Sequence, residues 1–180
     1  PPGCDVVSST YLADCADALL AAAAAGLASA TTGRPAPSTQ IVSHGAPPLD
    51  WCCDDGMLTV HVADVTHNQL YKNDLQQVPC GVEPRVQFVI TVARCWPTMD
   101  AQGNLSSALV DSAAQDQLED LWCLLTEVYD RAAARTLFPG QLTCGDVEVG
   151  AAVPVNADGG CAGWEIPLSL TTNDTGPTGS

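Results

Sequence analysis

The sequence predicts an α+β domain of two layers, in which two helices pack on a mainly antiparallel sheet. Three observations lead to this fold class. Two long segments, 11–30 and 108–137, repeat apolar residues at helical spacing. Strand-like segments lie between and after them, joined by loops that favour antiparallel pairing. Each helix has one apolar stripe to bury against the sheet, so the predicted order is α-β-β-β-α-β-β.

The first helix is predicted for residues 11–30. Hydroxyl side chains at residues 8–10 can cap its amino end, and Gly33 with Pro35 ends it. Alanines at 21–25 add little side-chain volume, so this helix should lie close to whatever it covers. Its apolar stripe consists of Leu12, Cys15, Leu19, Ala23 and Leu27.

Three strands are predicted next. Residues 39–43 form a short candidate, and residues 57–65 alternate apolar and polar side chains. Residues 85–96 are apolar on both faces, which places them in the centre of the sheet, and Pro97 ends that strand. The polar segment 66–84 is predicted to be a long loop.

The second helix is predicted for residues 108–137 and ends at the Phe138-Pro139-Gly140 sequence. Acidic residues, Asp120 among them, flank its apolar stripe, which is predicted to face the sheet. The stripe consists of Leu118, Leu121, Trp122, Leu125, Val128, Tyr129 and Ala132.

Two final strands are predicted at residues 144–155 and 164–171. Pro167 cannot donate a ladder hydrogen bond, so the last strand should lie at an edge or contain a bulge. The sequence contains no internal repeat and no linker that would divide it. Residues 1–170 are therefore predicted to form a single domain, followed by a flexible tail at 171–180.

The charge of the chain limits its partners. Its 21 acidic and 6 basic residues give a formal net charge of −15. Such a surface repels phosphate backbones and anionic membranes, so DNA is not expected to be held, although it can pass nearby. No segment has the length of a membrane span or the basic flank of a signal peptide, so we expect a soluble protein made in the cytoplasm. The simpler alternative is that acidity only confers solubility.

The chain has nine cysteines, an odd number that cannot pair completely within one chain. A metal site would draw on cysteines and histidines that lie close in sequence, but their spacing matches no paired zinc motif. No metal and no cofactor are therefore predicted. The residues considered for such a site are His44, Cys52, Cys53, His61 and His67.

The stretch DGGCAGWEIPLSL raises the question of catalysis, because Gly159, Cys161 and Gly163 fit the Gly-x-Cys-x-Gly outline of a nucleophile elbow. Such an elbow follows a strand and precedes a helix. This stretch instead precedes a strand, and no histidine lies near it in sequence. We therefore expect no catalytic residue here and interpret the stretch as a structural bend, in which the glycines permit positive φ.

Four segments, taken in order, resemble the tail terminator proteins of long-tailed (siphovirus-type) actinobacterial phages. They are VSHGAPPLDWCCDDGMLTVHV, RVQFVITVARCWPTMDAQGN, a long helix containing LEDLWCLL, and GGCAGWEIPLSL. The resemblance covers about residues 42–170, and the order of the segments is more telling than any one of them. The most specific pieces are GGCAGW before the last strand and RCWP at the end of the central strand.

The resemblance implies a structural virion protein and not an enzyme. Members of the family form a hexameric ring at the head-proximal end of the tail tube, where they stop tube polymerisation and join the tail to the head. The implied partners are further copies of the chain, the major tail tube protein and a head-completion or connector protein. The implied location is the neck of the virion, assembled in the host cytoplasm, with DNA passing through the lumen without specific binding and with no membrane partner.

The residues expected to matter are structural. Trp96, Trp122 and Trp164 are predicted core anchors, and Gly159, Gly160, Cys161 and Gly163 are predicted to form the bend. The loop at 66–84 and the tail from residue 171 are the expected contact elements. The basic residues expected at subunit contacts are Arg34, Lys72, Arg85, Arg94, Arg131 and Arg135.

Two alternatives to a tail terminator stay open. A head-closure or adaptor protein, or a tube subunit, would belong to the same neck. A small cysteine- or metal-dependent enzyme would belong to a different class.

Overall fold

The most apolar strand of the chain forms the centre of the sheet, as its sequence predicts. β3 (Pro84–Cys95) pairs antiparallel with β2 (Met57–His67) on one side and with β6 (Cys161–Thr172) on the other. Every second side chain of β3 from Val86 to Val92 is buried. A strand that pairs on both sides and lies beneath helices gains from apolar side chains along its whole length.

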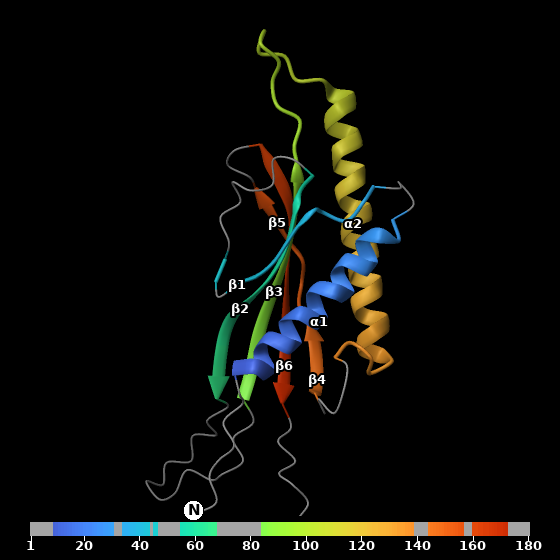
Figure 1. The fold of residues 1–180 in the computed structure, drawn as a ribbon. Helices are drawn as coiled ribbons and strands as arrows, with labels where there is room; N and C mark the ends of the chain where they lie inside the picture. The colour runs from blue at the N-terminus through green and yellow to red at the C-terminus, as the bar shows by residue number, and fades with distance from the viewer. Residues whose placement is uncertain are drawn as a thin grey trace, which may run out of the picture.

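The remaining strands complete a single sheet in the order β1-β2-β3-β6-β4. The computed structural model describes residues 9–30, 34–43, 45–46, 55–67, 84–138, 144–156 and 160–172. β1 (Thr39–Ser43) pairs parallel with β2 at one edge. At the other edge, β4 (Cys144–Val149) and β5 (Val153–Asn156) pair in succession with β6. The α+β class and the predicted element order are confirmed, with the strand predicted at 144–155 divided in two (Figure 1).

Both helices contribute to the core on one face of this sheet. α1 (Ser9–Ala28) crosses the sheet diagonally, and α2 (Ser107–Ala133) lies beside it (Figure 1). The two helices approach closely at Gly26, where an added Cβ would lie 2.9 Å from the carbonyl oxygen of Cys123. The largest buried side chains of this core are Leu19, Leu27, Leu58, Val60, Val86, Phe88, Ile90, Leu124, Ile166, Leu168 and Leu170.

The buried face of α2 differs from the predicted stripe. Leu124 and Val128 are buried, whereas Leu118 and Tyr129 are exposed and Trp122 is 72% exposed. The prediction that Trp122 anchors the core is therefore wrong. Three other members of the stripe, Leu121, Leu125 and Ala132, pack partly against the core.

An acidic residue explains this error. Asp120 was assigned to the solvated flank of α2, but it is buried and lies one helical turn before Leu124. A charged residue can occupy such a position when an opposite charge is buried with it, and Arg94 of β3 supplies that charge. The polar pattern of α2 therefore does not mark its solvent side at this turn.

The prediction that the strand containing Pro167 lies at an edge is wrong, because β6 pairs on both sides. The predicted alternative, a bulge, corresponds to a register shift between Cys144 and Val147 in the pairing of β4 with β6. Pro167 itself pairs in register opposite Val89 of β3. On the other side of β6 its carbonyl oxygen accepts a hydrogen bond from the N–H of Gly150 at 2.8 Å. This contact falls between the stretches of β6 that pair with β4 and β5, so the donor that proline lacks is not needed by a strand there.

The other face of the sheet has a second, smaller core made by Met57, Ala93 and Cys161. The side chains of Thr59, His61 and Thr91 are also buried on this face. Neither α1 nor α2 is long and apolar enough to cross a membrane.

Candidate functional site: a hollow and a projecting arm

Residues that the sequence singled out meet around one hollow at the end of the sheet where β6 begins. The hollow has a volume of about 360 Å³. Gln117 of α2 and the β5 residues Pro154 and Val155 form part of its wall. The sequence-predicted residues in the wall are Trp96, Gly160, Cys161, Gly163 and Trp164.

Two glycines fix the backbone around the hollow, each for a different reason. Gly160 has a φ of +86°, and its carbonyl oxygen accepts a hydrogen bond from the N–H of Trp96 at 2.6 Å. Gly163 lies within β6, where an added Cβ would be 1.8 Å from the carbonyl oxygen of Val92. A side chain at Gly163 would therefore force β3 and β6 apart.

The predicted bend is confirmed only at Gly160. Cys161 and Gly163 are strand residues that pair with Cys95 and Ala93, because β6 begins three residues earlier than the sequence analysis placed it. Gly159 lies outside the described residues.

The two tryptophans of the hollow are partly buried and expose part of their rings. Trp164 packs against the main core, and its indole Nε1–H donates a hydrogen bond to the carbonyl oxygen of Gln117 at 3.1 Å. This bond fixes β6 to α2. Trp96 directly follows β3 and forms another part of the wall.

The sulfur of Cys161 is not available as a nucleophile in this structure. The residue is buried and disulfide-bonded, and nucleophilic attack requires a free thiolate. Within the described residues, the wall of the hollow has no other ionisable side chain. The hollow is thus suited to binding an apolar group.

A buried ion pair holds this end of the sheet to α2. Arg94 Nε lies 2.9 Å from Asp120 Oδ2, and Nη2 lies 3.3 Å from Oδ1, so the pair is bidentate. Nη1 of Arg94 also donates hydrogen bonds to the carbonyl oxygens of Pro35 and Asp55, at 3.1 and 3.0 Å. Arg94 thereby joins four separate segments of the chain.

This pair was not predicted, although the sequence contains a signal for it. Arg94 is the only charged side chain in the apolar run VQFVITVARCW. A charge in a central strand requires a buried partner, so this arginine indicates a carboxylate elsewhere in the fold. Its expected place at a subunit contact is wrong, because it is buried inside the subunit.

Three further arginines are paired with carboxylates within the chain. These pairs leave little unpaired positive charge on the described surface. Lys72 lies outside the described residues. The pairs are Arg34 with Asp116 at 2.9 Å, Arg85 with Glu148 at 2.6 Å, and Arg131 with Glu127 at 2.6 Å.

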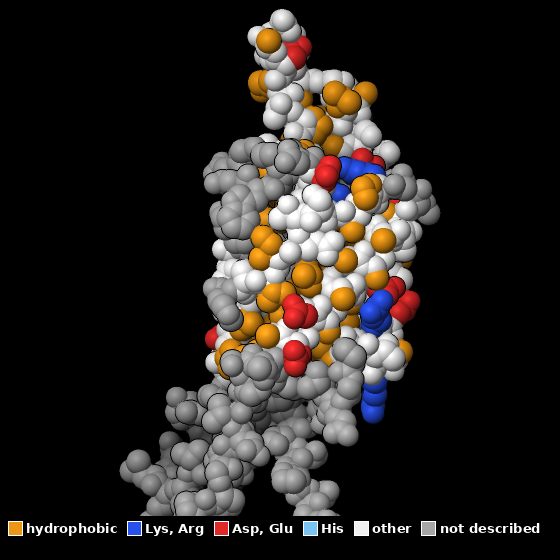
Figure 2. Space-filling model, in the orientation of Figure 1, with side chains coloured by type: hydrophobic (Ala, Val, Ile, Leu, Met, Phe, Trp, Pro, Cys, Tyr) orange, Lys and Arg blue, Asp and Glu red, His pale blue; other side chains and the backbone are white. Residues whose placement is uncertain are grey.

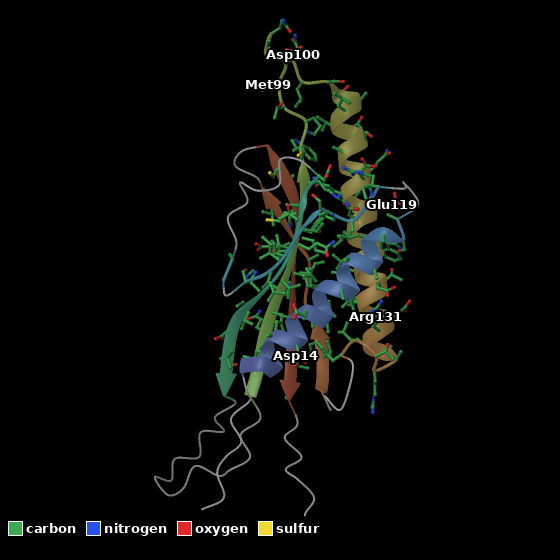
Figure 3. All side chains as sticks on the ribbon, in the orientation of Figure 1. Asp14, Met99, Asp100, Glu119 and Arg131 are labelled. Carbon is green, nitrogen blue, oxygen red and sulfur yellow. The ribbon has the colours of Figure 1, made fainter. Side chains whose placement is uncertain are left out.

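Between β3 and α2 the chain projects away from the body. We call residues 97–110, which include the first turn of α2, the arm (Figure 1). Figure 3 shows Met99 and Asp100 near its far end. Asp100 Oδ1 accepts hydrogen bonds from the N–H groups of Gln102 and Asn104, at 2.9 and 2.8 Å. The bond from Asn104 is the main reason that the pKa of Asp100 lies below its usual value.

The arm exposes apolar side chains although its backbone is held by hydrogen bonds. Met99 is 68% exposed, and Leu105 and Leu109 are also exposed. Figure 2 shows apolar surface on this projection. The contact elements expected from the sequence did not include residues 98–107.

His61 lies on the opposite face of the sheet from the helices. Burial lowers its pKa below 6.5, and the nearby charge of Glu165 opposes that shift. The Nδ1 atom of His61 has no hydrogen-bond partner, nor do the hydroxyls of Thr59 and Thr91.

The structure gives limited information on the residues considered for a metal site. His44, Cys52 and Cys53 lie outside the described residues, as does the side chain of His67. Among the described residues, no three or more histidine, cysteine or carboxylate side chains gather as a metal site would require.

No protein-family model matches the chain, and no curated protein matches it.

Proposed function

We propose that the chain is a structural virion protein, a tail terminator. It assembles into a ring at the head-proximal end of a phage tail tube, stops tube growth and joins the tail to the head connector. The observation that carries this proposal is a sheet that is open on both sides. Among the described residues, β1 pairs only with β2, and β4 and β5 pair only with β6.

Open edges on opposite sides of a sheet favour head-to-tail assembly. An unpaired edge presents N–H and C=O groups that a strand of another subunit can satisfy. Because the two edges differ, such a contact joins unlike surfaces, and repeated contacts of this kind close into a ring when the rotation per subunit fits.

The two sequence pieces that carry the resemblance most specifically are neighbours in space. This proximity supports the interpretation that they form one structural feature. RCWP ends β3 and GGCAGW begins β6, with Arg94 paired to Ala162 and Cys95 to Cys161. Residues 157–159 are outside the described part of the chain. The shared feature formed by these pieces is the wall of the hollow.

The charge of the chain supports a lumen through which DNA slides. A net charge of −15 repels phosphates, and four of the arginines are already paired within the subunit. We propose that duplex DNA passes through the ring without specific binding. Acidity that only confers solubility would leave the lumen and the exterior equally acidic.

The test uses the purified chain, the tail tube protein of the same phage, and electron microscopy with mass measurement. We expect closed rings that bind one end of growing tubes and limit their length. A tube subunit would instead form open-ended tubes, and a head-closure or adaptor protein would form rings that leave tube growth unchanged. A chain that stays monomeric with and without tube protein would contradict the proposal.

Salt dependence and DNA binding supply a second test. Ring formation should increase as salt shortens the Debye length from ~30 Å at ~0.01 M to ~8 Å at ~0.15 M, because subunits of like charge repel one another. Tight, salt-sensitive binding of duplex DNA to the ring would contradict the sliding role, because it requires exposed basic groups.

A further inference from the structure

We propose that the arm of one subunit inserts Met99 into the hollow of a second copy of this chain. The inference rests on the proposed ring, since it names a contact between its subunits. Its evidence is separate, however, and lies in the arm and the hollow themselves.

The arm has the properties of a preformed binding element. Its turn is held by the hydrogen bonds of Asp100, by a bond from the N–H of Asp100 to the carbonyl oxygen of Asn104 at 2.9 Å, and by a bond from the N–H of Gly103 to the carbonyl oxygen of Asp100 at 2.9 Å. All side chains from 98 to 109 are nevertheless exposed. A segment that is already ordered loses little conformational entropy on binding, and its exposed apolar side chains gain from burial.

Charge identifies the occupant as a second copy. A basic partner would bind best to the acidic surface of this protein, whereas a partner that is itself strongly acidic needs a contact free of like charges. The arm has a single charged residue, Asp100, in positions 97–110, and none of the described residues in the wall of the hollow is charged. In a chain with a net charge of −15, these two surfaces can meet without strong repulsion.

The chemistry of the two surfaces also matches. The flexible thioether of methionine fits irregular apolar spaces and makes favourable contacts with aromatic rings. Trp96 and Trp164 supply such rings in the hollow. Gln117, whose side-chain Nε2 has no hydrogen-bond partner, lies in the same wall and can turn this donor toward a carbonyl group of the entering arm.

A subunit does not fill its own hollow with its arm. No described residue of the arm is part of the wall of the hollow, and Met99 and Asp100 lie near the far end of the arm (Figure 3). The contact therefore joins unlike surfaces of two copies, which is the arrangement that produces rings or filaments.

Photo-crosslinking tests this contact directly. Benzoylphenylalanine replaces Met99 in the full chain, and isotope-labelled and unlabelled copies are mixed before irradiation. We expect crosslinks from position 99 to peptides of another copy that contain Val155 or Trp164. The same probe at Thr126, an exposed position of α2, should give no crosslinks to those peptides. Crosslinks from position 99 that are only within one chain, or that lie elsewhere, would overturn the proposal.

Two charge substitutions at exposed positions provide an independent test. Met99→Glu alters the arm and Pro154→Glu alters the hollow, so each variant alone should lose assembly at concentrations where the parent assembles. Their mixture should form pairs and nothing larger, because an intact arm and an intact hollow meet only once per pair. Thr126→Glu should assemble like the parent. Normal assembly of Met99→Glu, or failure of the mixture to pair, would overturn the contact.

The outcomes separate this inference from the proposed function. Rings that cap tubes but crosslink elsewhere would refute the arm contact and leave the ring role intact. Crosslinks between arm and hollow in open chains that do not cap tubes would confirm the contact and refute the tail terminator role. Thermal melting shows whether each variant is folded, and the crosslinking result decides the question where a variant is not.

Discussion

Asp120→Asn is expected to be strongly destabilising although it changes few atoms. It keeps the shape of the side chain but removes the negative charge from a pair whose side chains are only 5% and 2% exposed. Arg94 would keep its bonds to the two backbone carbonyls, yet its charge would stay buried without a counter-charge. Breaking a buried pair in this way costs about 3–5 kcal/mol, a large share of the ~5–15 kcal/mol that stabilises a domain.

Asp116→Asn is the matched control on the same helix. Asp116 pairs with Arg34 at 2.9 Å, but the side chains are 26% and 34% exposed, respectively. A pair of this exposure contributes about 0–1 kcal/mol. Urea denaturation followed by tryptophan fluorescence gives the free energy of unfolding of both variants and the parent. Equal losses in the two variants would refute the burial of the Arg94–Asp120 pair.

Three further substitutions test the helix face, the strand contact and the buried histidine. Trp122→Ala should lower the free energy of unfolding by less than ~1 kcal/mol, because the ring is 72% exposed. Leu124→Ala should lower it by about 2–5 kcal/mol, because Leu124 is buried. Similar losses for the two variants in urea denaturation would contradict the assigned buried face of α2. Gly163→Ala should destabilise more than Gly103→Ala. An added Cβ at 163 would clash with a backbone oxygen at 1.8 Å, whereas at Gly103 the cost is limited to the strain of its φ of +78°, because no atom lies within 4 Å. Thermal melts that rank the two variants the other way would contradict this strand spacing. Burial lowers the pKa of His61, so the unfolded chain binds its proton more readily: stability should be fully present above pH 6.5 and fall as pH drops below it. His61→Asn should weaken that fall below pH 6.5, and an unchanged pH dependence of the free energy of unfolding would count against the shift.

The fold could be predicted because its main features are local or come from continuous apolar patterns. β3 is mostly apolar from Val86 to Val92, a pattern that is typical of a central strand under helices. The prediction of the buried face of α2 was wrong where a long-range contact outweighs the local pattern. Asp120 is a charged residue, but it is buried because it forms an ion pair with Arg94. Hydrophobic periodicity considers each helix or strand by itself, so it cannot predict a side-chain partner on another element.

The same limit explains what the sequence analysis found and missed at the hollow. Two separate sequence pieces pointed to five residues of the wall, but not to Gln117 or to the β5 residues Pro154 and Val155. The sequence did not show that these residues lie next to one another in space. The pairing of β3 with β6 brings together residues more than sixty positions apart, such as Cys95 and Cys161. It also mistook the reason for Gly163, which is the close approach of another strand and not positive φ.

The small residues in the wall of the hollow are not all required for the same structural reason. Gly160 is required by its positive φ, and Gly163 by the backbone of β3, so a fold with no use for the hollow would still keep both. Ala162, between them, is a strand residue in the same wall, and neither of these two limits applies to it. A larger apolar side chain there would occupy part of the space and increase packing, a kind of change that commonly stabilises a subunit by itself. Space that the described residues leave open beside two partly buried tryptophans therefore fits a surface that is completed by a second chain, and this agrees with the exposed methionine on the arm.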